Sequence, residues 1–151
     1  MSLTLAPPRI ARNGRLGDVR RPPSTSASSA SRRPAADGSY TLLAQQATLS
    51  GGGIRIEARG SVKNIGYWNR PEDHIEWPVR LAAGRYAVDL LYAIADGSEG
   101  STIAVSWGDQ HLAATLGAAT GSWDTYARIP LGFIEVGEES VGEVRLECLQ
   151  K

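Results

Sequence analysis

Residues 65–81 read IGYWNRPEDHIEWPVRL, and this stretch decides the fold. In its second half, Ile75, Trp77, Val79 and Leu81 alternate with two charged residues and a proline. Such a period of two is the pattern of a half-buried β-strand. The sequence therefore predicts a strand from Ile75 onward and a loop, residues 67–73, that leads into it.

The loop concentrates side chains suited to binding. Two adjacent aromatic rings, an amide and two acids occur within seven residues: Tyr67, Trp68, Asn69, Glu72 and Asp73. Loops braced by rigid strands often carry binding residues, because the scaffold fixes the position of the loop. The alternative is a packed corner that closes the end of a β-sandwich. Adjacent residues of an extended loop point in opposite directions, so only one of Tyr67 and Trp68 needs to face a ligand.

From Ser39 onward the chain consists of short apolar runs separated by Gly, Ser, Asn and Asp, without helical periodicity. About nine short strands are predicted, at 40–49, 54–57, 75–81, 85–93, 102–107, 111–115, 127–131, 133–136 and 141–149. Strands of this length and spacing are typical of a two-sheet antiparallel β-sandwich, such as a jelly roll. The fold class predicted is therefore all-β.

Residues 1–38 differ in composition from the rest. Residues 1–37 hold seven arginines and two aspartates, a net charge of +5, whereas the whole chain is neutral. Large apolar side chains are almost absent after Val19. Such a segment cannot bury enough surface to offset the entropy of ordering, so the sequence predicts a disordered tail at 1–38 and a folded domain at 39–151. A nucleic-acid contact is disfavoured, because no aromatic residues lie among the arginines.

Several functional classes lack support. No apolar run is long enough for a membrane span, and no signal peptide is legible. Cys148 is the only cysteine and alternates with apolar residues, which indicates a buried thiol. His74 lies near Asp73 and Glu76, but no zinc-binding spacing, phosphate loop or nucleophile elbow is present. We therefore predict no catalytic residues.

Four motifs resemble carbohydrate-binding modules. Residues 42–51 are similar to the opening strand of the jelly rolls of families 6 and 35, and Gly66-Tyr67-Trp68 is similar to their Gly-Tyr loop. Residues 83–88, AGRYAV, match their Gly-x-Tyr strand, and residues 120–126, TGSWDTY, match their Thr-Gly-x-Trp segment. The resemblance covers residues 40–149. In particular, this part of the chain resembles the galactose-binding-like β-sandwich domains that are appended to α-L-fucosidases and sulfatases.

The resemblance implies non-catalytic carbohydrate binding, with a glycan or oligosaccharide as ligand and an enzyme domain as a further partner. The ligand-binding residues that it implies, together with the chemistry of the loop, are Tyr67, Trp68, Asn69, Glu72, Asp73, Trp123 and Asp124. Trp77 and Trp107 alternate with apolar neighbours and are expected in the core. The resemblance also implies an extracellular or periplasmic location, and localisation stays open because no signal is legible.

The chain departs from the family pattern in two respects. Leu43 and Gln45 stand where the family often has an acidic pair that binds calcium, so we expect no calcium at that site, although Glu147 could supply a carboxylate. The last strand also lacks the asparagine that the family often directs at the sugar.

Two hypotheses follow from these patterns. A carbohydrate-binding module predicts exposed rings at Tyr67 and Trp123. A structural or protein-interaction jelly roll, packed on a partner or on itself, predicts that these rings are buried and that an apolar patch lies elsewhere.

Overall fold

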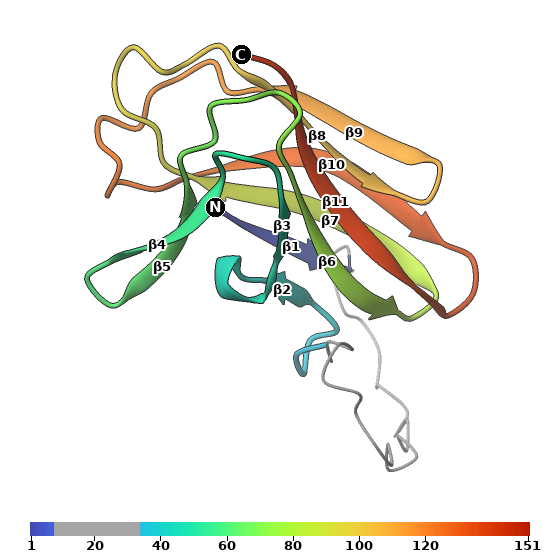
Figure 1. Ribbon diagram of the computed structural model, residues 1–151. Coiled ribbons are helices and arrows are strands. Elements are labelled where there is room, and N and C mark those ends of the chain that lie inside the picture. The colour runs from blue at the N-terminus through green and yellow to red at the C-terminus, as the bar shows by residue number, and fades with distance from the viewer. Residues whose placement is uncertain (8–33) are drawn as a thin grey trace.

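The structure, a computed structural model, describes residues 1–7 and 34–151. Two antiparallel sheets pack face to face, and a two-stranded hairpin lies beside them (Figure 1). Sheet A has the order β10-β7-β1-β2 and contains Ala127–Val136, Gly84–Tyr92, Ser2–Ala6 and Tyr40–Leu42. Sheet B has the order β3-β6-β11-β8-β9 and contains Thr48–Ser50, His74–Leu81, Ser140–Gln150, Thr102–Trp107 and Gln110–Thr115. The hairpin consists of β4, Arg55–Arg59, and β5, Val62–Gly66.

This architecture confirms the predicted all-β sandwich. The loop at residues 67–73 lies between β5 and β6. The alternation of apolar residues at 75–81 predicted the strand that follows this loop. No helix among the described residues has the length and apolar composition to cross a membrane.

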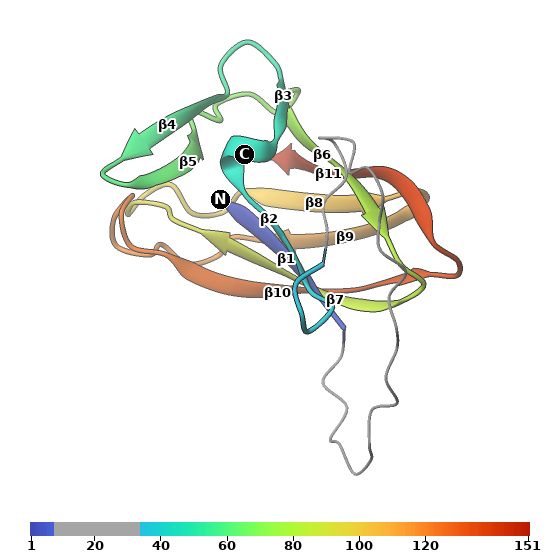
Figure 2. The ribbon, with the colours of Figure 1, turned by 90° about the horizontal axis from the view of Figure 1, so that it is seen from below.

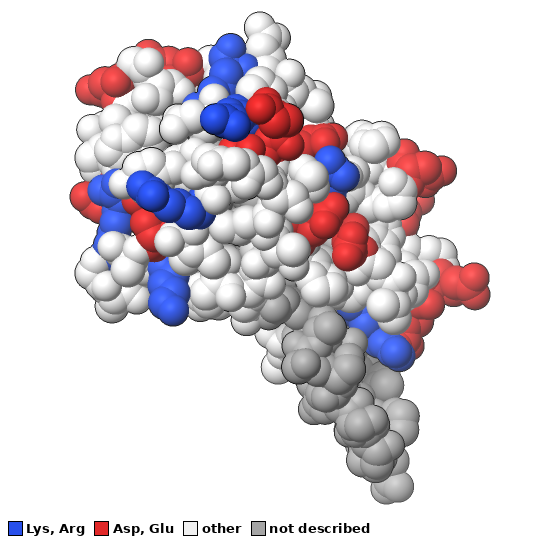
Figure 3. Space-filling view, viewed as in Figure 1, with Lys and Arg blue, Asp and Glu red and all other residues white. Residues whose placement is uncertain are grey.

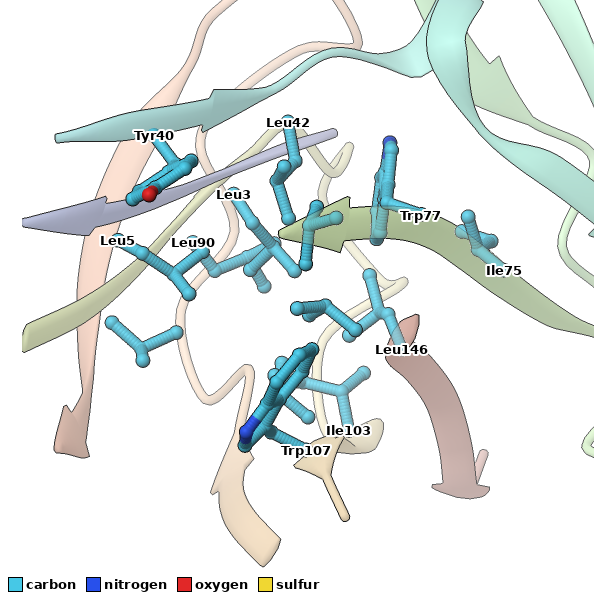
Figure 4. Packing of buried hydrophobic residues seen from close by; sticks show 14 of the residues in the cluster. Leu3, Leu5, Tyr40, Leu42, Ile75, Trp77, Leu90, Ile103, Trp107 and Leu146 are labelled. Carbon is cyan, nitrogen blue, oxygen red and sulfur yellow. The ribbon is translucent and has the colours of Figure 1, made fainter. Parts of the chain in front are cut away.

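The core lies between the two sheets and is filled by the inward positions of their strands (Figure 4). Trp77 is fully buried, and its indole Nε1 donates a hydrogen bond to the carbonyl oxygen of Leu43 at 2.9 Å. Trp107 is 8% exposed. Both tryptophans therefore belong to the core, as predicted.

The N-terminal residues correct the predicted domain boundary. Residues 1–6 were assigned to the tail, but β1 lies inside sheet A and pairs with both β2 and β7. Leu3 and Leu5 are fully buried. Their alternation with Ser2, Thr4 and Ala6 is a strand pattern, which the Arg- and Pro-rich residues after it obscured. The remainder of the predicted tail, residues 8–33, lies outside the described residues.

The predicted first strand, residues 40–49, is divided in two. β2 belongs to sheet A and β3 to sheet B, and a 3-10 turn, Ala44–Gln46, carries the chain between the sheets. The Gln46 side-chain Oε1 accepts a hydrogen bond from the Leu43 amide at 3.2 Å, which stabilises this corner.

The strands predicted at 127–131 and 133–136 form one strand, β10. Its register with β7 shifts between Pro130 and Gly132, so the expected break is a β-bulge. Gly132 has φ 137°, and a Cβ there would lie 3.1 Å from the Leu112 side chain. Glycine thus permits the bulge and the close approach of β9.

Candidate functional site

A cavity of about 380 Å³ lies at one end of the sandwich, where the β4–β5 hairpin stands apart from the two sheets (Figure 2). We call it the end pocket. Its lining comes from segments far apart in sequence: Met1, Glu57, Arg59, Asn64, Ile65, Gly66, Tyr67, Trp68, Asn69, Ala93, Ile94, Ser98, Ser101, Ile103, Leu116, Trp123, Cys148 and Lys151. Its volume is at the lower end of the usual range for small-molecule sites, about 300–1,000 Å³.

The hairpin supplies a polar wall. Alternate residues of β4 share a face, and the cross-strand pairing of Glu57 with Asn64 adds the amide to the face that carries Arg59. The Arg59 guanidinium Nε lies 3.1 Å from Glu57 Oε1, and this hydrogen bond is the main cause that raises the pKa of Arg59. A Cβ at Gly66 would lie 2.6 Å from Glu57 Oε1, so glycine leaves room for this carboxylate. Lys and Arg side chains gather on the hairpin side of the molecule (Figure 3).

Another part of the lining is apolar, and we call it the apolar wall. It consists mainly of Trp123 and the buried side chains Ile94, Ile103 and Leu116. Trp123 is 44% exposed, so its ring is not part of the core. The lining of the pocket therefore combines carboxylate, guanidinium and amide groups with an aromatic ring and aliphatic side chains.

Thr120 holds the segment that carries Trp123. Its hydroxyl donates to the carbonyl oxygen of Ile94 at 2.9 Å and accepts from the Ile94 amide at 3.0 Å, and its own amide donates to the same carbonyl at 3.0 Å. Ser122 extends this bonding, because its hydroxyl lies 2.9 Å from that of Thr125. These contacts fix the backbone on both sides of the tryptophan before any ligand arrives.

Tyr67 is the only described non-glycine residue with positive φ, at 58°. The side chain is 50% exposed, and the Arg55 guanidinium lies over the ring at 3.6 Å from its centroid. A cation over the face of an aromatic ring is attracted to it, so one face of Tyr67 is covered. Left-handed backbone in a tyrosine is costly, and such residues cluster at binding sites.

The neighbouring residues complete this side of the pocket. Trp68 is half-buried and packs against the core, and its Nε1 donates to the carbonyl oxygen of Asp73 at 3.0 Å. Asn69 is exposed, and its Oδ1 accepts from Lys151 Nζ at 3.5 Å. The structure thus brings Tyr67, Trp68, Asn69 and Trp123 together in the pocket lining.

Asp73 lies away from the pocket. We expected it to contact a ligand, but it is fully buried. Its two carboxylate oxygens accept hydrogen bonds from the amides of Gly52 and Ile54, each at 3.1 Å. Asp73 therefore holds the chain between β3 and β4. A burial of this kind is decided by distant contacts, which sequence spacing cannot show.

Glu72 and Asp124 also lie outside the lining. Glu72 is exposed in the loop. The Asp124 carboxylate is 71% exposed and lies 3.6 Å from Arg59 Nη1, an ion pair that joins the Trp123 segment to the hairpin.

Sequence reasoning missed Glu57, Arg59 and Asn64. The prediction ended the strand at residue 57 and assigned none at 62–66, so the hairpin was not recognised. The available signal was the turn pair Gly60-Ser61 between two short runs. In the structure Gly60 has φ 62°.

Met1, which lines the pocket, and Tyr126, which lies outside the lining, carry ionisable groups with shifted pKa values. The Met1 amino group donates to the Asn64 side-chain oxygen, and burial lowers the pKa of this amine to about 5. Burial also raises the pKa of Tyr126, helped by the charge of Asp124, and the Tyr126 hydroxyl has no hydrogen-bond partner in the described part of the chain.

Cys148 lies in the pocket lining, 5% exposed, and burial raises the pKa of its thiol. Because the thiolate is the reactive form, we expect iodoacetamide at pH 7.5 to modify folded Cys148 at least about tenfold more slowly than the same chain in guanidinium chloride. Mass spectrometry over time measures both rates. Equal rates would show that the thiol is accessible and ionised.

Residues 1–7 and 34–151 contain no group of three or more His, Cys, Asp or Glu side chains arranged to hold a metal ion. Leu43 and Gln45, the positions of the family's acidic pair, lie at the corner between β2 and β3. The two histidines lie outside the pocket, His74 on β6, where Nε2 is 3.7 Å from Glu76 Oε1, and His111 on β9.

Comparison with known proteins identifies the fold. Neither a protein-family model nor a curated protein matches the sequence. Solved structures do match. One is the C-terminal family 6 carbohydrate-binding module of a marine laminarinase from Zobellia galactanivorans, with a TM-score of 0.54 and 17% identity over 66% of this chain and 80% of the module. The fold is a carbohydrate-binding-module-like jelly roll.

A family 35 carbohydrate-binding module from Clostridium thermocellum has the same fold. Its TM-score is 0.53, with 18% identity over 70% of this chain and 82% of that one. In fold, both structures agree with the resemblance to the jelly rolls of families 6 and 35, and the likeness to domains of α-L-fucosidases and sulfatases stays a prediction.

Proposed function

We propose that this jelly roll is a non-catalytic module that binds a sugar in the end pocket. The observation that carries the proposal is that one cavity is lined both by polar hairpin groups and by an exposed aromatic ring. A pyranose ring has an apolar C–H face and a rim of hydroxyl groups, so it needs an aromatic surface on one side and directional polar groups on the other. Trp123 supplies the first, and Glu57, Arg59 and Asn64 supply the second.

Ring exposure favours this function over a purely structural role. Tyr67 and Trp123 are 50% and 44% exposed, as a binding module predicts, whereas rings that packed in the core of this domain would be buried. Support for a non-catalytic role comes from the lining, in which Glu57 is paired with Arg59 and neither histidine takes part. The two similar solved structures are also binding modules.

The expected affinity is modest. Covering about 100 Å² of apolar sugar surface contributes roughly 2–3 kcal/mol. Each net hydrogen bond to a hydroxyl adds about 0.5–1.5 kcal/mol. Two or three such bonds give dissociation constants in the millimolar to high-micromolar range, roughly −4 to −6 kcal/mol.

Calorimetry with laminaritriose, cellotriose, xylotriose and mannotriose tests this proposal. For the trisaccharide that binds, we expect Trp123→Ala to weaken affinity at least about tenfold, because the apolar wall loses its main ring. Tyr67→Ala is expected to act in the same direction.

Phe133→Ala is the matched control. This ring is 47% exposed but lies on β10, outside the pocket lining, with Arg85 over its face at 4.2 Å. The affinity of Phe133→Ala for the trisaccharide should equal that of the unmodified protein. Thermal melting should show that all variants fold. Equal losses in Trp123→Ala and Phe133→Ala, or no binding of any sugar, would contradict the proposal.

A further inference from the structure

Tyr67 is held at two points, although half of its surface is exposed. The Arg55 guanidinium lies over one face of the ring, with Cζ 3.6 Å from the ring centroid. The connection between β3 and β4 approaches the backbone of the same residue, because a Cβ at Gly53 would lie 3.2 Å from the Tyr67 carbonyl oxygen. These contacts surround a tyrosine whose φ of 58° is unfavourable for a residue with a bulky side chain.

The register of the hairpin places Arg55 beside this ring. Arg55 is the first residue of β4 and pairs with Gly66, the last residue of β5, so it lies next to the residue that precedes Tyr67. The amide of Ile54, just before β4, donates to the buried Asp73 carboxylate at 3.1 Å. The strand that carries Arg55 therefore starts from a fixed point.

In the described part of the chain, the Arg55 guanidinium contacts the ring and forms no ion pair with a carboxylate. Arg59, on the same strand, pairs with two carboxylates. Arg55 also lies outside the lining of the end pocket, whereas Tyr67 is part of it. An effect of Arg55 on a ligand in this pocket therefore has to pass through the tyrosine.

We propose that Arg55 is a positioning residue for sugar binding, because its guanidinium holds the Tyr67 ring in the orientation that lines the end pocket. This inference rests on the proposed sugar binding and adds a residue from outside the lining. Without the cation, an exposed tyrosine ring is free to adopt other rotamers. A cation over an exposed ring is a weak interaction, and affinity falls in proportion to the fraction of molecules that keep the binding orientation. The expected loss is therefore about two- to fivefold.

NMR titration with the trisaccharide that binds measures this loss. Arg55→Met removes the charge and should weaken binding about two- to fivefold, whereas Arg55→Lys keeps a cation and should bind more tightly than Arg55→Met. Arg85→Met is the matched control, since Arg85 lies over the Phe133 ring at 4.2 Å and neither residue lines the pocket. Its affinity should equal that of the unmodified protein. Equal affinities in Arg55→Met and Arg85→Met would overturn the inference.

Combination with Tyr67→Ala shows whether Arg55 acts through the ring. In a chain that already carries Tyr67→Ala, Arg55→Met should cause no further loss of affinity, because the side chain that it positions is absent. A loss of the same size with and without the tyrosine would mean that Arg55 contacts the sugar directly, and the positioning role would be wrong.

The ring can also be observed without a sugar. The NMR signals of the Tyr67 ring protons, assigned by their absence in Tyr67→Ala, should move toward the positions of an unstructured tyrosine in Arg55→Met and stay unchanged in Arg85→Met. If they do not move in Arg55→Met, Arg55 does not hold the ring and the inference is overturned, whatever the titrations show. If no trisaccharide binds, the proposed function fails and the role of Arg55 in sugar binding fails with it, while the ring signals still decide whether Arg55 holds Tyr67.

Discussion

Replacing Asp73 with Ala is expected to destabilise the domain by about 3–5 kcal/mol. The carboxylate is fully buried and accepts hydrogen bonds from the amides of Gly52 and Ile54. Hydrogen bonds to charged groups contribute about 1.5–3 kcal/mol each, and truncation leaves two amides without their acceptor. A Cβ at Gly51 would lie 2.0 Å from the Asp73 carboxylate, which shows how closely the backbone wraps this side chain.

Urea unfolding measures this effect. Glu72→Ala is the control, because Glu72 is adjacent but exposed, and it should change the free energy of unfolding by no more than about 0.5 kcal/mol. Asp73→Asn keeps one acceptor oxygen and should lie between the two. If Asp73→Ala lowers the free energy of unfolding no more than Glu72→Ala does, the hydrogen bonds to the Asp73 carboxylate do not stabilise the fold.

Replacing Leu5 with Ala is expected to destabilise the domain by about 2–5 kcal/mol, the usual range for a buried leucine. Leu5 has no exposed surface and lies on β1, between β2 and β7 in sheet A. Truncation leaves a cavity that the paired strands cannot close, because their register fixes the backbone on both sides.

The control for this prediction is Thr4→Ala. Thr4 is only partly buried, opposite Asp89 on the outer face of the same strand, and its loss should cost clearly less than that of Leu5. Thermal or urea unfolding of the full chain separates the two cases. If Leu5→Ala unfolds like the unmodified protein, residues 1–6 are not part of the folded domain.

Much of the fold was readable in the sequence because strand periodicity is local. The alternation from Ile75 to Leu81 predicted β6, the same pattern predicted β7 and β8, and the turn that follows β8 predicted β9. β1 and β5, which have five residues each, were not predicted. β1 was hidden by the Arg- and Pro-rich composition of the residues that follow it, and β5 lacked a clear apolar face.

The candidate site was also predicted from the sequence only in part. Tyr67 was predicted from the chemistry of its loop, and Trp123 from the resemblance of residues 120–126 to a Thr-Gly-x-Trp segment. The structure leaves both exposed in one pocket. The hairpin residues Glu57 and Arg59 carry no local signal of binding. Their role depends on where the hairpin lies relative to the sandwich (Figure 2).

By itself, the sequence determined the all-β class, the loop before β6 and the burial of Trp77 and Trp107, because these follow from periodicity along a strand. Only the tertiary structure decided which polar groups face the pocket. Asp73 and Glu57 are both acids beside strands, but one is buried against the backbone amides of Gly52 and Ile54 and the other lines a cavity. Pairing between residues distant in sequence makes that difference, and local spacing does not contain it.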